Sequence, residues 1–346
     1  MLGDPSRTPS MNSAIPRPPR RVGRRALLSL PALHVGLARA QGVGFPEAGR
    51  PVQVIVPYPP GGGSDISARA LAPILERELG TPVVIVNRPG ANSQIGLAQT
   101  AQARPDGYTL CYGLWPSTIT LYLDPSRRAG FGKDSFTPLA MHVIDPGSII
   151  VRADSRLKAL ADLVAEARAR PGAVRVSDPG ILSWEHLASL ALQKAHGLNF
   201  NQIHYQGSAP ALVALLSGEI EVAFVATGTA MSQSRSGVAR TLAVLDAQES
   251  EFLPGVPTAT AQGTRIVTGS ARGFIGPAGL PAAVEAALAG ALQRAILSAE
   301  HTTKMRELGL PIRYMNPMTF RAYWAAEEAA LGPLVHEVVT SGEAAK

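Results

Sequence analysis

Residues 56–65 read Val56-Pro57-Tyr58-Pro59-Pro60-Gly61-Gly62-Gly63-Ser64-Asp65, in which three glycines connect the end of an apolar strand to the start of a helix. Residues 52–56 are β-branched apolar residues except for Gln53, as in a buried strand. The residues predicted on the buried face of the following helix are Ile66, Ala70, Ile74, Leu75 and Leu79. We expect Asp65 to cap this helix and Gly80 to end it.

The glycines of this segment favour binding of an anion. They allow a ligand to approach the backbone closely, and the free N–H groups and dipole at a helix start attract negative charge. Ile66 occupies the last glycine position of a dinucleotide-binding motif, and no P-loop lysine follows. The segment therefore predicts a carboxylate site. The alternative is an ordinary turn in which Asp65 only caps the helix.

A second loop, residues 87–96, follows the next predicted strand, residues 83–86, and reads Asn87-Arg88-Pro89-Gly90-Ala91-Asn92-Ser93-Gln94-Ile95-Gly96. Ligands of open α/β sheets bind beyond the carboxyl ends of the strands, so both loops are expected at one place. For Arg88 alone we favour a solvated or structural role over a ligand contact.

The rest of the chain alternates short β-branched runs with helical patterns, which is typical of parallel strands joined by crossover helices. One series covers residues 51–112 and another residues 149–244. The last seventy residues add a strand and two helices, which we expect to return to the first series. The predicted fold is α/β, with two doubly wound lobes and a hinge. Residues 46–147 and 271–346 would form the first lobe, and residues 148–270 the second.

The charge of the chain is concentrated at its N-terminus. Seven arginines and one aspartate in residues 1–40 account for the whole net charge of +6. The remainder is formally neutral, so no nucleic-acid partner is expected. Arginines precede an apolar run at residues 26–38, and Ala38-Arg39-Ala40 resembles a cleavage site. We predict a signal peptide over residues 1–40, of Sec or twin-arginine type, starting at Met1 or Met11, and a periplasmic mature protein.

Side chains that would carry catalysis or hold a metal form no recognisable motif. Cys111 is the single cysteine, which excludes an intramolecular disulfide, and its apolar neighbours indicate a buried strand position. His196 and His204 lack metal-ligand spacing, and no Gly-x-Ser-x-Gly motif occurs. We therefore expect no enzyme activity, no cofactor and no metal.

Several segments, in this order and spacing, resemble the Bug family, the periplasmic receptors of tripartite tricarboxylate transporters. The family pattern includes Val-Pro-aromatic, Gly-Gly-Gly-Thr/Ser-Asp, Asn-Arg-Pro-Gly-Ala and Pro-Asp-Gly-Tyr-Thr-Leu. The matching segments are residues 56–58, 61–65, 87–91, 105–110, 205–211, 216–221, 253–258 and 276–279. The resemblance covers nearly all of the chain after residue 46.

This resemblance implies a Venus-flytrap receptor, expected to be a monomer, that captures a small carboxylate and delivers it to integral membrane permease subunits. Two loops of the first lobe would hold the carboxylate, and residues 207–209 would donate N–H groups from the second lobe. The residues that we expect at the ligand site are Tyr58, Gly62, Gly63, Ser64, Asp65, Pro89, Gly90, Ala91, Asn92, Trp115, Ser183, His186, Gly207, Ser208 and Ala209.

The chain departs from the family pattern at the edge of the expected pocket. Asn92 stands where the family usually has glycine, and residues 182–186 bring Trp184 and Glu185 in place of small hydroxyl residues. These changes favour a bulkier, less polar ligand, such as an aromatic or branched carboxylate. Trp115 and Trp184 could equally be packed against their own helices. A structural role is favoured for His186.

Two other functions remain open. An α/β enzyme could use the glycine segment to bind a phosphate or nucleotide, although it would need a catalytic base, metal cluster or phosphate-binding lysine nearby. A receptor of the same fold could also serve a sensor kinase or another signalling partner in place of a permease.

Overall fold

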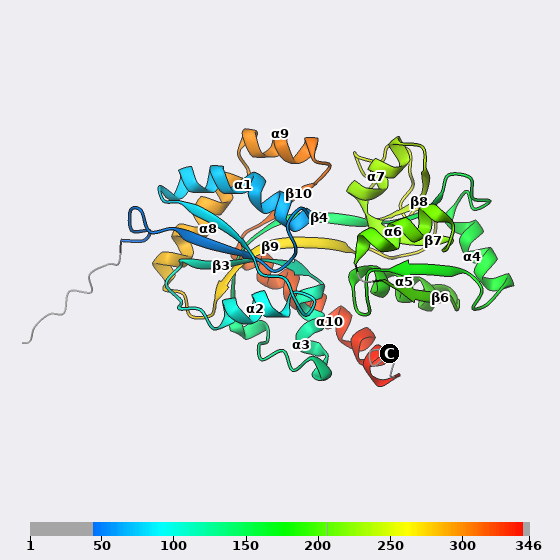
Figure 1. Ribbon diagram of the computed structural model, residues 1–346, viewed down its shortest axis with the longest axis horizontal. Helices are drawn as coiled ribbons and strands as arrows, with labels where there is room; N and C mark the ends of the chain where they lie inside the picture. The colour runs from blue at the N-terminus through cyan, green and yellow to red at the C-terminus, as the bar shows by residue number, and fades with distance from the viewer. Residues whose placement is uncertain (1–43, 206, 342–346) are drawn as a thin grey trace, which may run out of the picture. The chain divides into compact units, whose positions relative to one another are not determined.

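The computed structural model describes residues 44–205 and 207–341, and Figure 1 shows the course of the chain through its helices and strands. The predicted signal peptide, residues 1–40, lies outside the described residues, as does Gln206 of the segment 205–211.

The elements alternate along most of the chain. The first half contains β1 (Val52–Val56), α1 (Gly63–Leu79), β2 (Val83–Asn87), α2 (Gln94–Ala101), β3 (Thr109–Trp115), α3 (Ser117–Leu123), two 3-10 turns (Pro125–Arg127 and Lys133–Ser135) and β4 (Phe136–Arg152). The second half contains α4 (Leu160–Ala169), β5 (Arg175–Asp178), α5 (Trp184–His196), β6 (Asn201–His204), α6 (Ser208–Ser217), β7 (Val222–Ala226), α7 (Thr227–Arg235), β8 (Ala239–Leu245), β9 (Gly269–Pro277), α8 (Ala282–Ile296), α9 (Ala299–Glu307), β10 (Ile312–Met315) and α10 (Pro317–Thr340).

Within the described residues, ten strands are hydrogen-bonded into one sheet. The order is β2-β1-β3-β9-β4-β7-β5-β6, and β8 and β10 also pair with β4. β1 is parallel to β2 and β3, and β5 is parallel to β6 and β7. The pairs that β9 and β4 make are antiparallel. The α/β class predicted from the sequence is confirmed, with two parallel groups connected by antiparallel strands.

β4 and β9 are the two long strands that connect these groups, and Figure 1 shows them side by side. The first part of β4, residues 136–146, pairs with β9, and residues 147–152 pair with β8. The sequence predicts only short strands near residues 149–151 and 274–275. The remaining residues of β4 are not predicted as a strand, because Pro138, Pro146 and Gly147 interrupt the alternating pattern. The division into two lobes near residues 147 and 271 stays a prediction.

α1 packs on β1 and β3 through a face that the sequence predicts only in part. Ile74, Leu75 and Leu79 are buried as expected, but Ile66 is 40% exposed. Leu71 is fully buried in its place. Ile66 lies beside the buried face, which Ser67, Ala68 and Leu71 form in this part of the helix.

The C-terminal helices cover strands from the start of the chain, as the sequence predicts. Leu288 and Leu292 of α8 lie in the same core cluster as β1 and α1. Phe320 and Trp324 of α10 pack against Trp115 of β3. Asn316 caps α10, and its Oδ1 accepts the N–H of Thr319 at 2.9 Å.

Cys111 is a free thiol that is fully buried in β3, as expected. Burial raises the pKa of its thiol to about 12. Among the described residues, no single helix is long and apolar enough to cross a membrane, while α8 and α9, bent by 60°, reach that length and composition together.

Candidate functional site

The glycine loop, residues 57–62, and the second loop, residues 88–93, leave adjacent parallel strands at the same edge of the sheet. Val56 of β1 and Asn87 of β2 are partners in register. The N–H of Arg88 donates to Val56 O at 2.8 Å, and Asn87 Nδ2 donates to Tyr58 O at 3.0 Å. The two loops are thus connected directly, as their positions in the sequence predict.

Asp65 holds the two loops together with its carboxylate. Oδ2 accepts the N–H of Gly61 at 2.9 Å, and Oδ1 accepts from Arg69 Nε and Asn87 Nδ2, both at 2.9 Å. Although burial opposes ionisation, the hydrogen bonds from Arg69, Gly61 and Asn87 lower the pKa of Asp65. The prediction that Asp65 caps α1 is wrong, because Gly62 occupies the cap position. Asp65 positions the glycine loop through hydrogen bonds that already occupy both oxygens.

Gly62, Gly63 and Ser64 form the start of α1. The first N–H groups of a helix have no partner within it, and the helix dipole makes this end positive. Gly62 and Gly63 are exposed, and Ser64 is buried. Tyr58 is half-buried just before them, and burial raises the pKa of its hydroxyl to about 12. The start of α1 can therefore receive an anion from the exposed side of the glycines.

The second loop has an unusual backbone. Ala91, Asn92 and Ser93 have φ values of 47°, 53° and 78°, and Gly90 has a φ of 131°. Consecutive non-glycine residues in this region are rare and occur preferentially where function requires them. Pro89, Ala91 and Asn92 are exposed, so this strained turn faces outward next to the glycine loop.

We expect Gly90→Ala to destabilise the second loop by about 1–3 kcal/mol. A Cβ at this position would lie 2.5 Å from Ile95 Cδ1, and its φ of 131° is unfavourable for alanine. Urea denaturation measures the loss. Gly61→Ala is the matched control, because Gly61 has a φ of 82° with nothing within 4 Å of the added Cβ. An equal loss for both variants would contradict the contact with Ile95.

Arg272 is a buried cation beside the start of α1. It lies on β9 and is 6% exposed. A Cβ on Gly63 would meet Arg272 Nη2 at 3.0 Å. Nη2 lies 3.9 Å from Asp145 Oδ2, while Nε and Nη1 have no hydrogen-bond partner among the described residues. Arg272 is absent from the residues expected at the site, although a charged side chain within the apolar segment 271–275 is a signal that could have identified it.

The residues expected from the segment 182–186 lie at the start of α5. Ser183 caps this helix, and its Oγ accepts the N–H of His186 at 3.2 Å. Glu185 is 6% exposed, and burial raises the pKa of its carboxyl to about 8. This carboxyl is therefore neutral at neutral pH, and the hydroxyl of Ser183 serves the helix in this structure.

His186 belongs to a cluster that the sequence does not predict. Ligand atoms of Asp178, His186 and His204 lie within 4.8 Å of one another, a spacing that could hold a metal ion. However, His186 Nδ1 accepts the N–H of Leu182 at 3.1 Å. A neutral imidazole that accepts at one nitrogen carries its proton on the other, so His186 Nε2 offers no lone pair to a metal in this arrangement. The geometry favours the structural role of His186.

Gly207, Ser208 and Ala209 form the start of α6. Gly207 has a φ of 114° and its N–H donates to Pro179 O at 3.2 Å. Ser208 and Ala209 are exposed. No hydrogen bond among the described residues joins these three residues to the glycine loop or to the second loop.

The two tryptophans near the expected pocket are packed in the core. Trp115 has no exposed surface, and its ring meets Phe320 and Trp324 edge-on at centroid distances of 4.9 and 4.8 Å. Trp184 is 4% exposed and lies against Gly147. Both positions favour the alternative that these aromatics pack against helices and strands.

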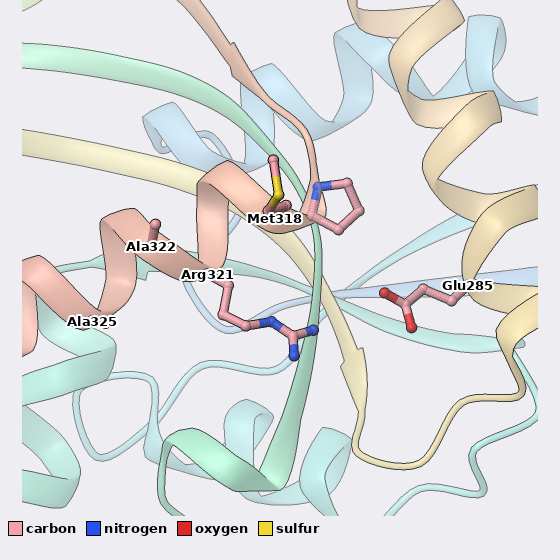
Figure 2. A pocket seen from close by; sticks show the side chains of 6 residues that line it. Glu285, Met318, Arg321, Ala322 and Ala325 are labelled. Atoms are coloured by element: carbon pink, nitrogen blue, oxygen red, sulfur yellow. The ribbon is translucent and has the colours of Figure 1, made fainter.

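Two surface hollows lie away from the loops. Figure 2 shows the larger one, of about 580 Å³, where Glu285 of α8 faces Met318 and Arg321 of α10. The residues that line the smaller one, of about 250 Å³, are Ile144, Pro146, Leu245, Asp246, Val267, Thr268, Gly269, Arg313, Tyr323 and Glu327. No residue expected at the ligand site lines either hollow, so the candidate site lies at the two loops.

Residues 67–339 match the family model described as tripartite tricarboxylate transporter family receptor, TctC. The chain belongs to the TctC family. The match begins just after the glycine loop and includes the second loop and Arg272. TctC proteins are periplasmic solute-binding receptors, and the Bug resemblance found in the sequence is confirmed.

Curated relatives of this TctC-family chain include Bug proteins. BugT of Bordetella pertussis is 38% identical over 211 residues, which cover 60% of this chain and 64% of BugT. The chain thus spans a little under two thirds of the length of BugT. A UPF0065 protein from the gbd 5' region of Cupriavidus necator is 29% identical over 296 residues, which cover 84% of this chain and 87% of that protein.

Solved structures of TctC-type proteins share the fold of this chain. A TctC solute-binding protein from Polaromonas, solved without ligand, is 29% identical with a TM-score of 0.72, covering 83% of this chain and 98% of that one. R. palustris Rpa4515, solved with adipate, is 26% identical with a TM-score of 0.75, covering 86% and 98%. The predicted fold class of periplasmic solute-binding proteins is confirmed.

Proposed function

We propose that the chain is an extracytoplasmic receptor that captures a small carboxylate and delivers it to a tripartite tricarboxylate-type membrane transporter. The observation that carries the proposal is the junction of the glycine loop and the second loop at the positive end of α1, where Asp65 fixes both. This arrangement suits a carboxylate, because helix N–H groups and a nearby cation complement its charge.

The family and its structures support this function. TctC proteins are solute-binding receptors, and R. palustris Rpa4515 was solved with adipate. The proposed ligand residues in the present chain are those of the two loops, namely Tyr58, Gly62, Gly63, Ser64, Pro89, Gly90, Ala91 and Asn92. Residues 207–209 would approach the carboxylate from the second lobe when residues 46–147 with 271–346 close onto residues 148–270.

We further propose that the chain acts as a monomer and binds its ligand without enzymatic turnover. Its partners are the permease subunits of the transporter. It reaches the periplasm through a signal peptide at residues 1–40. Uptake of the ligand in a strain that lacks the gene distinguishes the two kinds of partner. Uptake falls if the partner is a permease and is unchanged if the partner is a signalling protein.

Calorimetry on the purified protein tests ligand capture. We use adipate, succinate, benzoate and isovalerate as probes, with AMP and inorganic phosphate as the comparison. The expected result is micromolar binding of at least one carboxylate, about −8 kcal/mol in free energy, without turnover. Silence of all four carboxylates contradicts the proposal, and binding of AMP favours the enzyme alternative.

Export provides a separate prediction. When the full-length chain is expressed in a bacterial host, the protein recovered from the periplasm should begin at Gln41, because Ala38-Arg39-Ala40 is the expected cleavage site. Intact-mass spectrometry measures the N-terminus. Replacing Ala38 and Ala40 with bulky residues serves as control and should block processing. A cytoplasmic protein that retains its first forty residues would contradict this part of the proposal.

A further inference from the structure

Arg272 carries a buried charge whose hydrogen-bonding capacity is largely unused. It lies on β9 between β3 and β4, paired with Leu114 and Val143. Its side chain is 7% exposed, and neither Nε nor Nη1 has a hydrogen-bond partner among the described residues. A guanidinium stays charged at every relevant pH, and burying such a charge is unfavourable unless it is paired and hydrogen-bonded.

Among the described residues, no acidic group accepts a hydrogen bond from Nε or Nη1 of Arg272. Asp145 Oδ2 lies 3.9 Å from Nη2, which is too long for a hydrogen bond. The carboxylate of Asp145 instead accepts the N–H groups of Thr227 and Gly228 at the start of α7. Glu185 also lies within electrostatic reach of Arg272, but burial raises the pKa of Glu185 to about 8, so its carboxyl is neutral at pH 7.

The start of α1 adds a second positive feature at the same place. Arg272 Nη2 lies 3.0 Å from the position of a Cβ on Gly63, the first residue of this 17-residue helix. A cation is unfavourable at the N-terminus of a helix, where the dipole is already positive. A buried cation with unpaired N–H groups that meets a helix start would be stabilised by an anion that contacts both.

We propose that Arg272 is the direct counter-ion of the ligand carboxylate. Nη1 donates to one of its oxygens, and N–H groups of Gly63 and Ser64 at the start of α1 complete its coordination. A hydrogen bond from a charged guanidinium to a carboxylate is stronger than one between neutral groups. This inference rests on the proposed function and names the residue that selects a charged ligand over a neutral one.

Calorimetry of Arg272→Gln with adipate, succinate, benzoate and isovalerate tests the proposal. We expect affinity for the carboxylate that the wild type binds to fall at least 30-fold. The same measurement with the matching amide, such as adipamide or benzamide, gives the decisive comparison. The wild type should discriminate strongly against the amide, and Arg272→Gln should not. Arg313→Gln is the matched control, because Arg313 is a half-exposed strand arginine paired with Asp246.

Thermal unfolding separates a ligand contact from a structural role. Because Nε and Nη1 are unpaired, ligand-free Arg272→Met should melt no lower than the wild type, whereas a structural arginine would lower the melting temperature. If Arg272→Gln and Arg272→Met do not fold, Arg272→Lys keeps the charge but loses the planar guanidinium, and we expect weakened binding at a normal melting temperature.

The outcomes distinguish this inference from the proposed function. If the wild type binds a carboxylate and Arg272→Gln binds it equally well, the role of Arg272 is overturned while the receptor function stands. If inorganic phosphate binds the wild type more tightly than every carboxylate, the site serves a different anion and the inference is overturned. If no carboxylate binds the wild type, both the receptor function and the inference fail.

Discussion

Trp115→Ala is expected to destabilise the protein by about 3–5 kcal/mol, the usual cost of removing a large buried aromatic. Trp115 has no exposed surface, and Phe320 and Trp324 of α10 both pack edge-on against its ring. The substitution leaves a cavity between β3 and α10 that rigid strands cannot close. Urea denaturation followed by circular dichroism measures the change in the free energy of unfolding.

Trp115→Phe is the matched control for this cavity. It keeps an aromatic ring, and the indole Nε1 that it removes has no hydrogen-bond partner among the described residues. The expected loss is therefore smaller, about 1–2 kcal/mol. Both variants that fold should bind the ligand with near wild-type affinity. Lost binding at unchanged stability would instead place Trp115 at the ligand, as one interpretation of the sequence has it.

The parallel strands and the position of both loops could be predicted from local sequence. Residues 83–86 are a continuous apolar run, and residues 52–56 are apolar except for Gln53. Each run is followed by glycine and proline, so strand ends and loops are unambiguous. Parallel pairing then brings the two loops to one edge of the sheet. The predicted strand, residues 83–86, stops one residue short of the end of β2 at Asn87, whose side chain bonds the glycine loop.

The antiparallel strands and the central cation could not be predicted in the same way. β4 runs for 17 residues through Pro138 and Pro146, and its pairing with β9 depends on residues more than a hundred positions away. Arg272 meets Gly63 only through that pairing. The residues around Arg272 are brought together only by the tertiary structure. The local sequence therefore shows only that a charged residue lies in an apolar strand.

The roles of individual polar residues were also decided by tertiary contacts. Asp65 reads as a helix cap because aspartate is common there, but the helix begins at Gly63. Its carboxylate therefore lies within the first turn, where it bonds backward to Gly61 and across to Asn87. His204 meets Asp178 through the parallel pairing of β5 with β6, and His186 joins them from α5, which sequence spacing does not reveal.

Asp65→Ala is expected to lower the free energy of unfolding by about 2–4 kcal/mol, because it breaks buried, charge-assisted hydrogen bonds. The carboxylate bonds Gly61 N–H, Arg69 Nε and Asn87 Nδ2. Without it the glycine loop loses its connection to the second loop. Affinity for the carboxylate should therefore fall by at least tenfold, because the hydrogen bonds of Asp65 hold the two loops in place. Urea denaturation and calorimetry on one preparation measure both effects.

The pH dependence of Asp65→Asn distinguishes a carboxylate effect from a packing effect. Hydrogen bonds from Arg69, Gly61 and Asn87, opposed by burial, lower the pKa of Asp65 in the folded protein. Its stabilisation is therefore complete above the unfolded-state pKa, about 3.9, and is lost as the pH falls through the lower folded-state pKa. The stability difference between wild type and Asp65→Asn should be largest at neutral pH and shrink below about pH 4. Asp154→Asn, at an exposed ion pair, should show little difference at either pH. A loss that is independent of pH would mean that Asp65 acts through its shape and not its charge.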